Sequence, residues 1–174
     1  YQVEGFRSDA AGTWAVTVSY TEAGVRKQAS FAVTVKEAVR KGMTFRQKGL
    51  TYRVTKVSGK RGTVLVTGAV KKKVKSVTIP KTVTVKGVTC LVTGIGKYAF
   101  KNCRRLSKVV IGANVETIGK GAFAQAGKLK TIQVKSKKLK TVGKHALKGI
   151  HKKAVIRIPK GKKKEYIKKS RKKG

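Results

Sequence analysis

Residues 95–100 read Ile-Gly-Lys-Tyr-Ala-Phe, and the pattern returns 23 residues later as Ile-Gly-Lys-Gly-Ala-Phe at 118–123. After 24 more residues it returns as Val-Gly-Lys-His-Ala-Leu at 142–147. A fixed period in the twenties is typical of a solenoid, in which each unit is too small to bury its own apolar face and must stack on its neighbours. The repeat therefore predicts a stacked, mainly β fold, which favours a binding scaffold over a catalyst.

A short apolar strand is expected in each repeat unit. The corresponding segments are 77–79, 109–111, 132–134 and 156–158. Residues 106–114 also match the leucine-rich pattern Leu-x-x-Leu-x-Leu-x-x-Asn. The second unit has Lys137 where Asn would fall, and the third has Lys153 at the first Leu position. The repeat therefore decays toward the end of the chain.

One face of each unit is expected to point into the core. The predicted inward residues are Ile95, Ala99, Phe100, Cys103, Leu106, Val109, Ile111, Ile118, Ala122, Phe123, Ala126, Leu129, Ile132, Val134, Val142, Ala146, Leu147, Ile150, Ile156 and Ile158. The Ala-Phe segments predict short helical turns on the convex side, where Ala permits close approach and Phe fills the gap between layers. The glycines of residues 112–121 are explained as repeat turns.

The string Ile-Gly-x-x-Ala-Phe-x-x-Cys-x-x-Leu-x-x-Val-x-Ile at 95–111 resembles the BspA-type leucine-rich repeats of bacterial surface proteins. The match is good again at 118–134 and weaker at 142–158. With a cap and a basic tail, the resemblance covers about residues 42–174. It implies a leucine-rich-repeat solenoid from the C-terminal region of a secreted or cell-wall-associated protein, often a host- or matrix-binding adhesin. It implies no catalytic residue and no cofactor.

The region before the repeats is strand-rich and predicts an N-terminal cap made of β-hairpins. Lys48-Gly49 and Lys86-Gly87 are the expected hairpin turns, because glycine tolerates a positive φ. Solenoids need an atypical terminal unit to cover their first open face. We therefore assign residues 38–94 to the cap and first strand, 95–159 to the repeats and 160–174 to a basic tail.

Residues 1–37 differ from the rest of the chain. Alternating apolar and polar residues predict antiparallel strands at 14–20 and 31–35, joined by a polar turn segment at 21–30. This ending resembles the last strands of bacterial immunoglobulin-like modules. The segment 1–37 is less than half as long as a complete β-sandwich domain. Because the chain begins at Tyr1 without Met, we expect a segment of a longer protein.

The net charge of +38 is concentrated in one part of the chain. Residues 1–37 contain four basic and four acidic groups, whereas 38–174 contain the other 40 basic groups and only Glu116 and Glu165. Such a surface repels itself, which predicts a monomer, and attracts polyanions. Lysine outnumbers arginine by 34 to 10. This ratio favours diffuse attraction over bidentate recognition of individual groups.

Two surfaces are candidates for binding. Outward positions of the repeat strands form a ladder of Thr78, Val110, Gln133 and Arg157, flanked by Ser76, Lys108, Thr131 and Val155. The basic tail offers polyanion contacts at Lys162, Lys163, Lys164, Lys168, Lys169 and Arg171. The basic surface can be read as simple solvation and repulsion between molecules, or as an electrostatic landing surface for acidic partners.

Residue types that carry catalysis or bind metals are sparse after residue 37. Glu116 and Glu165 are expected to be surface counter-charges, and His145 and His151 to occupy variable outward positions. Cys90 and Cys103 are two packed thiols or, alternatively, a disulfide. No Cys or His cluster completes a metal site, and no uncharged run approaches the roughly 20 residues that cross a bilayer.

The sequence thus favours a non-enzymatic extracellular binding module of a bacterial surface protein, without cofactor and without membrane insertion. Its partners would be a host or matrix protein or an anionic glycan. The alternative is structural attachment of the parent protein to anionic cell-wall polymer. Nucleic-acid binding is less favoured, because Phe100 and Phe123 are assigned to the core and leave no aromatic platform for stacking bases.

Overall fold

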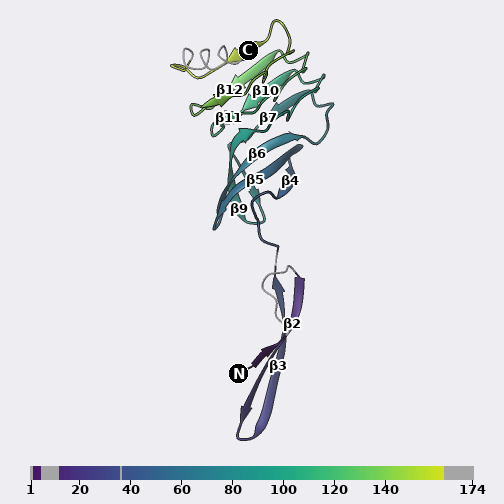
Figure 1. Ribbon diagram of the computed structural model, residues 1–174, viewed down its shortest axis with the longest axis vertical. Helices are drawn as coiled ribbons and strands as arrows, with labels where there is room; N and C mark the ends of the chain where they lie inside the picture. Colours follow the sequence, from purple (N-terminus) through teal and green to yellow (C-terminus); the bar gives the residue numbers. More distant parts are fainter. Residues whose placement is uncertain (1, 5–11, 36, 163–174) are drawn as a thin grey trace. The chain divides into compact units, whose positions relative to one another are not determined.

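The computed structural model describes residues 2–4, 12–35 and 37–162 (Figure 1). The chain separates into two compact units, Tyr1–Val39 and Arg40–Gly174. The described residues form strands and turns and contain no helix. The strands are β1 (Gln2–Glu4), β2 (Gly12–Glu22), β3 (Val25–Val35), β4 (Thr44–Gln47), β5 (Leu50–Ser58), β6 (Arg61–Ala69), β7 (Ser76–Thr78), β8 (Thr82–Val85), β9 (Val88–Ile95), β10 (Lys108–Ile111), β11 (Thr117–Ile118), β12 (Thr131–Val134), β13 (Thr141–Val142) and β14 (Val155–Arg157).

The first unit is an antiparallel sheet of strand order β1-β2-β3. β2 and β3 pair along their whole length and are joined by Ala23 and Gly24, whose φ angles are 48° and 76°. Two consecutive positive φ angles make a tight hairpin turn, whose twist matches that of the strands. The predicted ten-residue turn at 21–30 was therefore wrong, because the strands continue through most of it. The proposed immunoglobulin-like origin of this unit stays a prediction.

The second unit stacks two sheets of short strands. One sheet has the order β14-β12-β10-β7 and is parallel throughout (Figure 1). The other has the order β13-β11-β9-β6-β5-β4, with β8 paired to β9. In the first sheet, Val77 aligns with Val109, Ile132 and Ile156 in turn. The predicted correspondence between the repeat strands is thus confirmed, and the architecture is a solenoid.

The cap is a run of antiparallel hairpins that extends the second sheet. β4 pairs with β5 and β8 with β9, and both tight turns are Lys-Gly pairs with positive φ, 48° and 75° at Lys48 and Gly49 and 47° and 76° at Lys86 and Gly87. The two predicted hairpin turns are therefore confirmed. β6 then runs parallel to β9, which joins the cap to the first repeat by the same kind of ladder that joins the repeats.

The Ala-Phe segments form a third ladder between turns. The backbone N–H groups of Tyr98, Phe100 and Asn102 donate to the carbonyls of Lys120, Ala122 and Ala124, at 2.9, 2.7 and 2.9 Å. Tyr98 and Asn102 have φ angles of 56° and 61°. The left-handed conformation interrupts a right-handed helix, and these N–H groups bond to the next turn. The predicted helical turns were therefore wrong.

The core runs along the solenoid axis and thins at its last turn. Phe100 and Phe123 are fully buried and stack with their ring centroids 5.3 Å apart. Every predicted inward residue of the first two repeats is buried except Ala99, which is half-buried. In the third repeat only Ala146 is buried, and Ile156 is 44% exposed, because no described turn stacks on its far side. Val115 and Leu139, which are buried in the loops after the strands, were not among the predicted core residues.

Cys90 and Cys103 are free and buried, with 0% and 2% exposure. Burial raises the pKa of both thiols, so less of the reactive thiolate is present at neutral pH.

We expect DTNB to label both cysteines slowly in the folded protein and fully in denaturant. A mass two daltons too low before reduction, restored by a reductant, would instead show a disulfide.

Candidate binding surfaces on the repeats

The predicted strand ladder is assembled in register. Thr78, Val110, Gln133 and Arg157 occupy equivalent positions on β7, β10, β12 and β14. Thr78 and Arg157 are exposed, whereas Val110 and Gln133 are half-buried. In the flanking row, Lys108 is exposed and Thr131 half-buried. The ladder contains one cation and no acid, so it offers mixed contacts rather than a uniform charge.

The basic tail is only partly described. Lys162 is half-buried. The other predicted polyanion contacts lie outside the described residues: Lys163, Lys164, Lys168, Lys169 and Arg171.

A second ladder consists of lysines on successive turns. Lys97, Lys120 and Lys144 each follow the glycine of the repeat motif, and all three are exposed. The carbonyl of Lys120 accepts from Tyr98 N at 2.9 Å, and that of Lys144 accepts from Gly121 N at 3.1 Å. Neighbouring strand-like segments lie about 4.8 Å apart. We call Lys97, Lys120 and Lys144 the lysine column.

His145 lies beside two lysines of this column and beside Lys148. The pKa of His145 is lowered by partial desolvation and by the charges of Lys148, Lys144 and Lys120. A cation beside three others is disfavoured, so the imidazole stays neutral to lower pH than usual. His145 is half-buried rather than fully exposed, and its φ of 57° places it in the left-handed region.

Sequence reasoning missed the lysine column although its signal was available. The lysine recurs in all three copies of the repeat motif, but it was treated as part of an overall basic surface. A residue type repeated at one solenoid position must form a column in space, because equivalent positions stack. The candidate ladder chosen instead was the strand ladder, by analogy with where such folds present their sheets.

The motif glycines bring the turns of the column together. A Cβ on Gly119 would lie 2.6 Å from Lys97 N and 2.7 Å from Gly96 C. A Cβ on Gly143 would collide in the same way with Lys120 N and Gly119 C. Real Cβ atoms do not approach backbone this closely. These two glycines are therefore required for contact between turns, whereas the sequence had suggested only a role in a repeat turn for Gly119.

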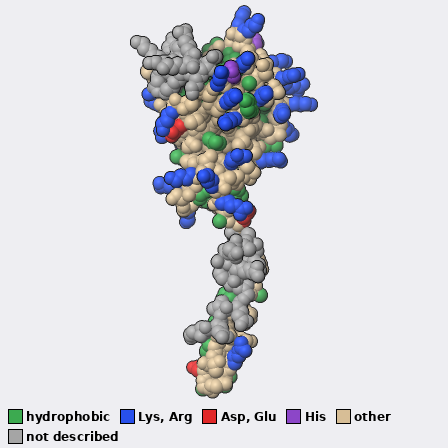
Figure 2. Space-filling view, in the orientation of Figure 1, with side chains coloured by type: hydrophobic (Ala, Val, Ile, Leu, Met, Phe, Trp, Pro, Cys, Tyr) green, Lys and Arg blue, Asp and Glu red, His purple; other side chains and the backbone are tan. Residues whose placement is uncertain are grey.

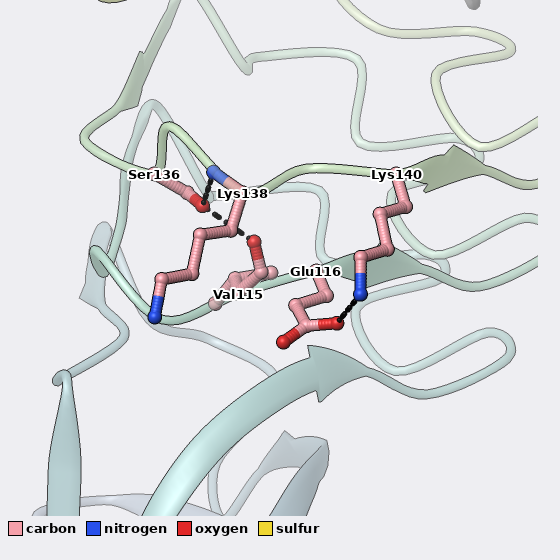
Figure 3. Close-up of polar contacts among 5 residues, drawn as sticks. All are labelled: Val115, Glu116, Ser136, Lys138 and Lys140. Atoms are coloured by element: carbon pink, nitrogen blue, oxygen red, sulfur yellow. Dashed lines mark hydrogen bonds and ion pairs between the residues drawn. The ribbon is translucent and has the colours of Figure 1, made fainter.

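Negative charge is nearly absent from the repeat unit. Among residues 40–162 the one acid is Glu116, whose Oε2 lies 2.6 Å from Lys140 Nζ on the next turn (Figure 3). The hydrogen bond from Lys140 is the main cause of a lowered pKa at Glu116, with smaller contributions from the charges of Lys140 and Lys138. Glu116, which was expected to be a surface counter-charge, is thus paired with Lys140. Figure 2 shows Lys and Arg over the face of this unit, with little Asp or Glu.

In the second repeat, Lys137 occupies the Asn position of the leucine-rich pattern, and the neighbouring Ser136 makes the loop contacts. Asn114 donates from Nδ2 to the carbonyl of Lys81 at 3.1 Å, and Lys137 at the next equivalent position cannot copy this neutral amide contact. The Ser136 hydroxyl, fully buried, instead donates to the carbonyl of Val115 at 2.6 Å and accepts from Lys138 N at 3.0 Å (Figure 3). A polar residue one position earlier therefore supports the loop.

Replacing Ser136 with alanine should destabilise the fold by about 1–2 kcal/mol, because it leaves a buried carbonyl without this partner. Chemical denaturation of the variant measures the effect. Ser107→Ala is the matched control, since that exposed hydroxyl also bonds a carbonyl of the preceding turn, Lys75 O at 2.9 Å. Water can replace an exposed contact, so the control should change stability by about 0.5 kcal/mol or less. Equal losses would contradict the role of burial at Ser136.

Features of other functional classes were also sought in the described residues. The part of the chain that the structure describes groups no three His, Cys, Asp or Glu side chains that could hold a metal ion. His151 accepts a hydrogen bond at Nδ1 from Lys153 N at 3.1 Å, which is a local turn contact. Within the same residues there is no helix with the length and apolarity that a membrane crossing requires.

The fold and its motif define a leucine-rich-repeat solenoid. The model of the BspA-type leucine-rich repeat region matches in six copies over residues 70–170, more than half of the chain. The chain therefore belongs to the BspA-type leucine-rich-repeat family. Among curated proteins, none matches.

Two solved structures of leucine-rich-repeat proteins are similar to the chain. A leucine-rich cell surface protein from Faecalibacterium prausnitzii A2-165 is 22% identical, with a TM-score of 0.54 over 70% of this chain and 33% of that one. A leucine-rich-repeat protein from Bacteroides ovatus ATCC 8483 is 27% identical, with a TM-score of 0.50 over 66% of this chain and 37% of that one. The chain thus spans about a third of either protein.

Proposed function

We propose that the chain is a non-catalytic extracellular binding module of a bacterial surface protein, which holds anionic ligands on its basic repeat surface. The observation that carries this proposal is the charge balance of the repeat unit. Residues 40–162 contain a single acid, already paired with Lys140, while lysines stand in register on successive turns. Membership of the BspA-type family and the likeness to a cell surface protein support a surface location.

The lysine column explains how this surface would act on a linear polyanion. The three lysines extend from backbone segments about 4.8 Å apart, so their like charges repel one another. An anionic chain lying along the solenoid axis relieves that repulsion at several turns at once. Lysine is a flexible, hydrated point charge, so it suits repeated sulfate, carboxylate or phosphate groups without fixing their geometry.

The proposed partners are a host or matrix protein or an anionic glycan, and the alternative function is structural attachment of the parent protein to anionic cell-wall polymer. The composition of the basic tail supports this alternative. Residues 160–174 contain nine basic groups and one acid, a density suited to polymer attachment. The strand ladder ending at Arg157 is proposed as a secondary contact for a protein partner.

A glycan array and a pulldown with purified teichoic acid, both using the full chain, separate these functions. Retention of sulfated or uronate-containing glycans but not of teichoic acid would support adhesion. Retention of teichoic acid alone would support cell-wall attachment. Retention of neither would overturn the proposed function.

A further inference from the structure

A hollow of about 490 Å³ lies where the cap meets the turn segment of the first repeat. Its walls come from β5, from the end of β6 and the loop after it, and from residues 98–103. The lining residues that matter here are Thr51, Thr67, Lys72, Tyr98, Lys101 and Asn102. The volume lies within the range of about 300–1,000 Å³ that is usual for small-molecule sites.

Backbone contacts hold the walls of the hollow in place. Gly96 N donates to Val66 O at 2.7 Å, which ties the repeat turn to β6. A Cβ on Gly68 would lie 2.9 Å from Ala99 O, so the two walls touch below the hollow. The site is therefore formed before any ligand arrives, which lowers the ordering cost of binding.

The hollow carries two cations and no acid. Lys101 Nζ lies 5.2 Å from the centroid of the Tyr98 ring, which keeps this ammonium group at the wall. The charge of Lys72 acts on Cys103 at the floor, where it partly opposes the rise in pKa that burial causes. The only carboxylate among residues 40–162 belongs to Glu116, which pairs with Lys140. Lys72 and Lys101 thus lack an acidic partner within this part of the chain.

The first turn has a non-glycine residue at both left-handed positions, whereas each later turn has one. Tyr98 and Asn102 both have left-handed φ angles, 56° and 61°. The equivalent pairs are Gly121 with Gln125 in the second turn and His145 with Gly149 in the third, so each of those turns has one glycine. A bulky tyrosine in this region is uncommon, and such strain clusters at ligand sites. The side chains of Tyr98 and Asn102 both line the hollow.

We propose that this hollow binds one acidic sugar residue, carboxylated or sulfated, of an anionic glycan. The inference rests on the proposed function and names a specific subsite within it. The two ammonium groups pair with the acidic group of the sugar. The amide of Asn102 and the hydroxyls of Thr51 and Thr67 hydrogen-bond its hydroxyls, while the Tyr98 ring supplies an apolar wall.

The repeat itself provides a matched control for the charge. Lys148 occupies in the third turn the position that Lys101 occupies in the first, and both are exposed. Calorimetric titration of the full chain with a sulfated, uronate-containing disaccharide should show saturable binding. Lys101→Gln and Lys72→Gln should each weaken it about tenfold, the usual loss for one charge-assisted hydrogen bond. Lys148→Gln, with the same change in net charge, should weaken it less than about twofold.

Two further measurements test recognition of the sugar. Tyr98→His, which copies the third turn, should lower disaccharide affinity, and the unfolding midpoint of the variant, measured alongside, separates a loss of binding from a loss of folding. Inorganic sulfate and an uncharged disaccharide should both bind more weakly than the acidic one. Equal binding of either probe, or an equal effect of Lys148→Gln and Lys101→Gln, would overturn the proposal.

The outcomes distinguish this inference from the broader one. Wild-type protein that binds long heparin chains but not the disaccharide would overturn the hollow alone. Wild-type protein that binds neither would overturn the proposed function as well.

Discussion

Replacing Phe123 with alanine should lower the free energy of unfolding by about 3–5 kcal/mol. Phe123 is fully buried and stacks on Phe100 with an angle of 5° between the rings. Its removal leaves a cavity between two turns that are also held by backbone hydrogen bonds, so the site cannot easily collapse. Urea denaturation followed by circular dichroism measures the loss.

The repeat supplies a control for this substitution. Leu147 is the equivalent residue of the last turn and is only half-buried, so Leu147→Ala should cost clearly less. A loss below about 1 kcal/mol at Phe123 would contradict its position between stacked turns.

Replacing Gly119 with alanine should destabilise the solenoid by about 1–3 kcal/mol, because overpacking forces neighbouring backbone apart. The added Cβ would lie 2.6 Å from Lys97 N, a backbone atom that cannot move without separating the turns. Thermal and chemical unfolding of the variant measure the effect.

Gly127→Ala is the matched control for Gly119→Ala. The nearest atom to a Cβ at Gly127 is Gly149 O at 4.0 Å, which is ordinary contact. That substitution should leave stability unchanged or raise it by about 0.4–1 kcal/mol through the unfolded state. Equal destabilisation by both variants would show that close approach is not what requires glycine at 119.

Periodicity in the sequence predicted the features that depend on equivalent positions. The offset of 23 residues aligns Val109 with Ile132 and Phe100 with Phe123, and the structure pairs these residues across neighbouring turns. The Lys-Gly hairpin turns of the cap were also predictable, because their backbone conformation is a local property of Lys48-Gly49 and Lys86-Gly87.

Features that depend on contacts between turns were less predictable from the sequence. The Ala-Phe segment has the composition of a helical turn, yet its N–H groups bond to the next turn and its left-handed residues exclude a helix. Ser136 took over the role of the missing Asn from a different position, which no alignment of the repeats reveals. The hollow beside Tyr98 joins segments that are spread through the chain from Thr51 to Cys103, so it forms only when the cap and the first turn pack together.

The lysine column has a signal in the sequence that was not interpreted as a column. The recurring lysine after each motif glycine was visible, but its meaning depends on the turns being brought together at Gly119 and Gly143. Once they are in contact, the column is the feature of the repeat surface that most directly supports polyanion binding. Its contribution can be separated from that of net charge.

The most direct test of this account measures the affinity of the full chain for a heparin fragment of defined length as salt is raised from about 50 to 200 mM. Counterion release predicts that log K falls linearly with log salt. Glutamine at Lys97, Lys120 and Lys144 should reduce the slope by on the order of one per lysine. Glutamine at Lys41, Lys60 and Lys137, which are exposed and lie outside the column, should reduce it less. Affinity that does not change with salt, or that is lost on mutating Gln133 and Arg157 with the column intact, would contradict electrostatic binding by the repeat lysines.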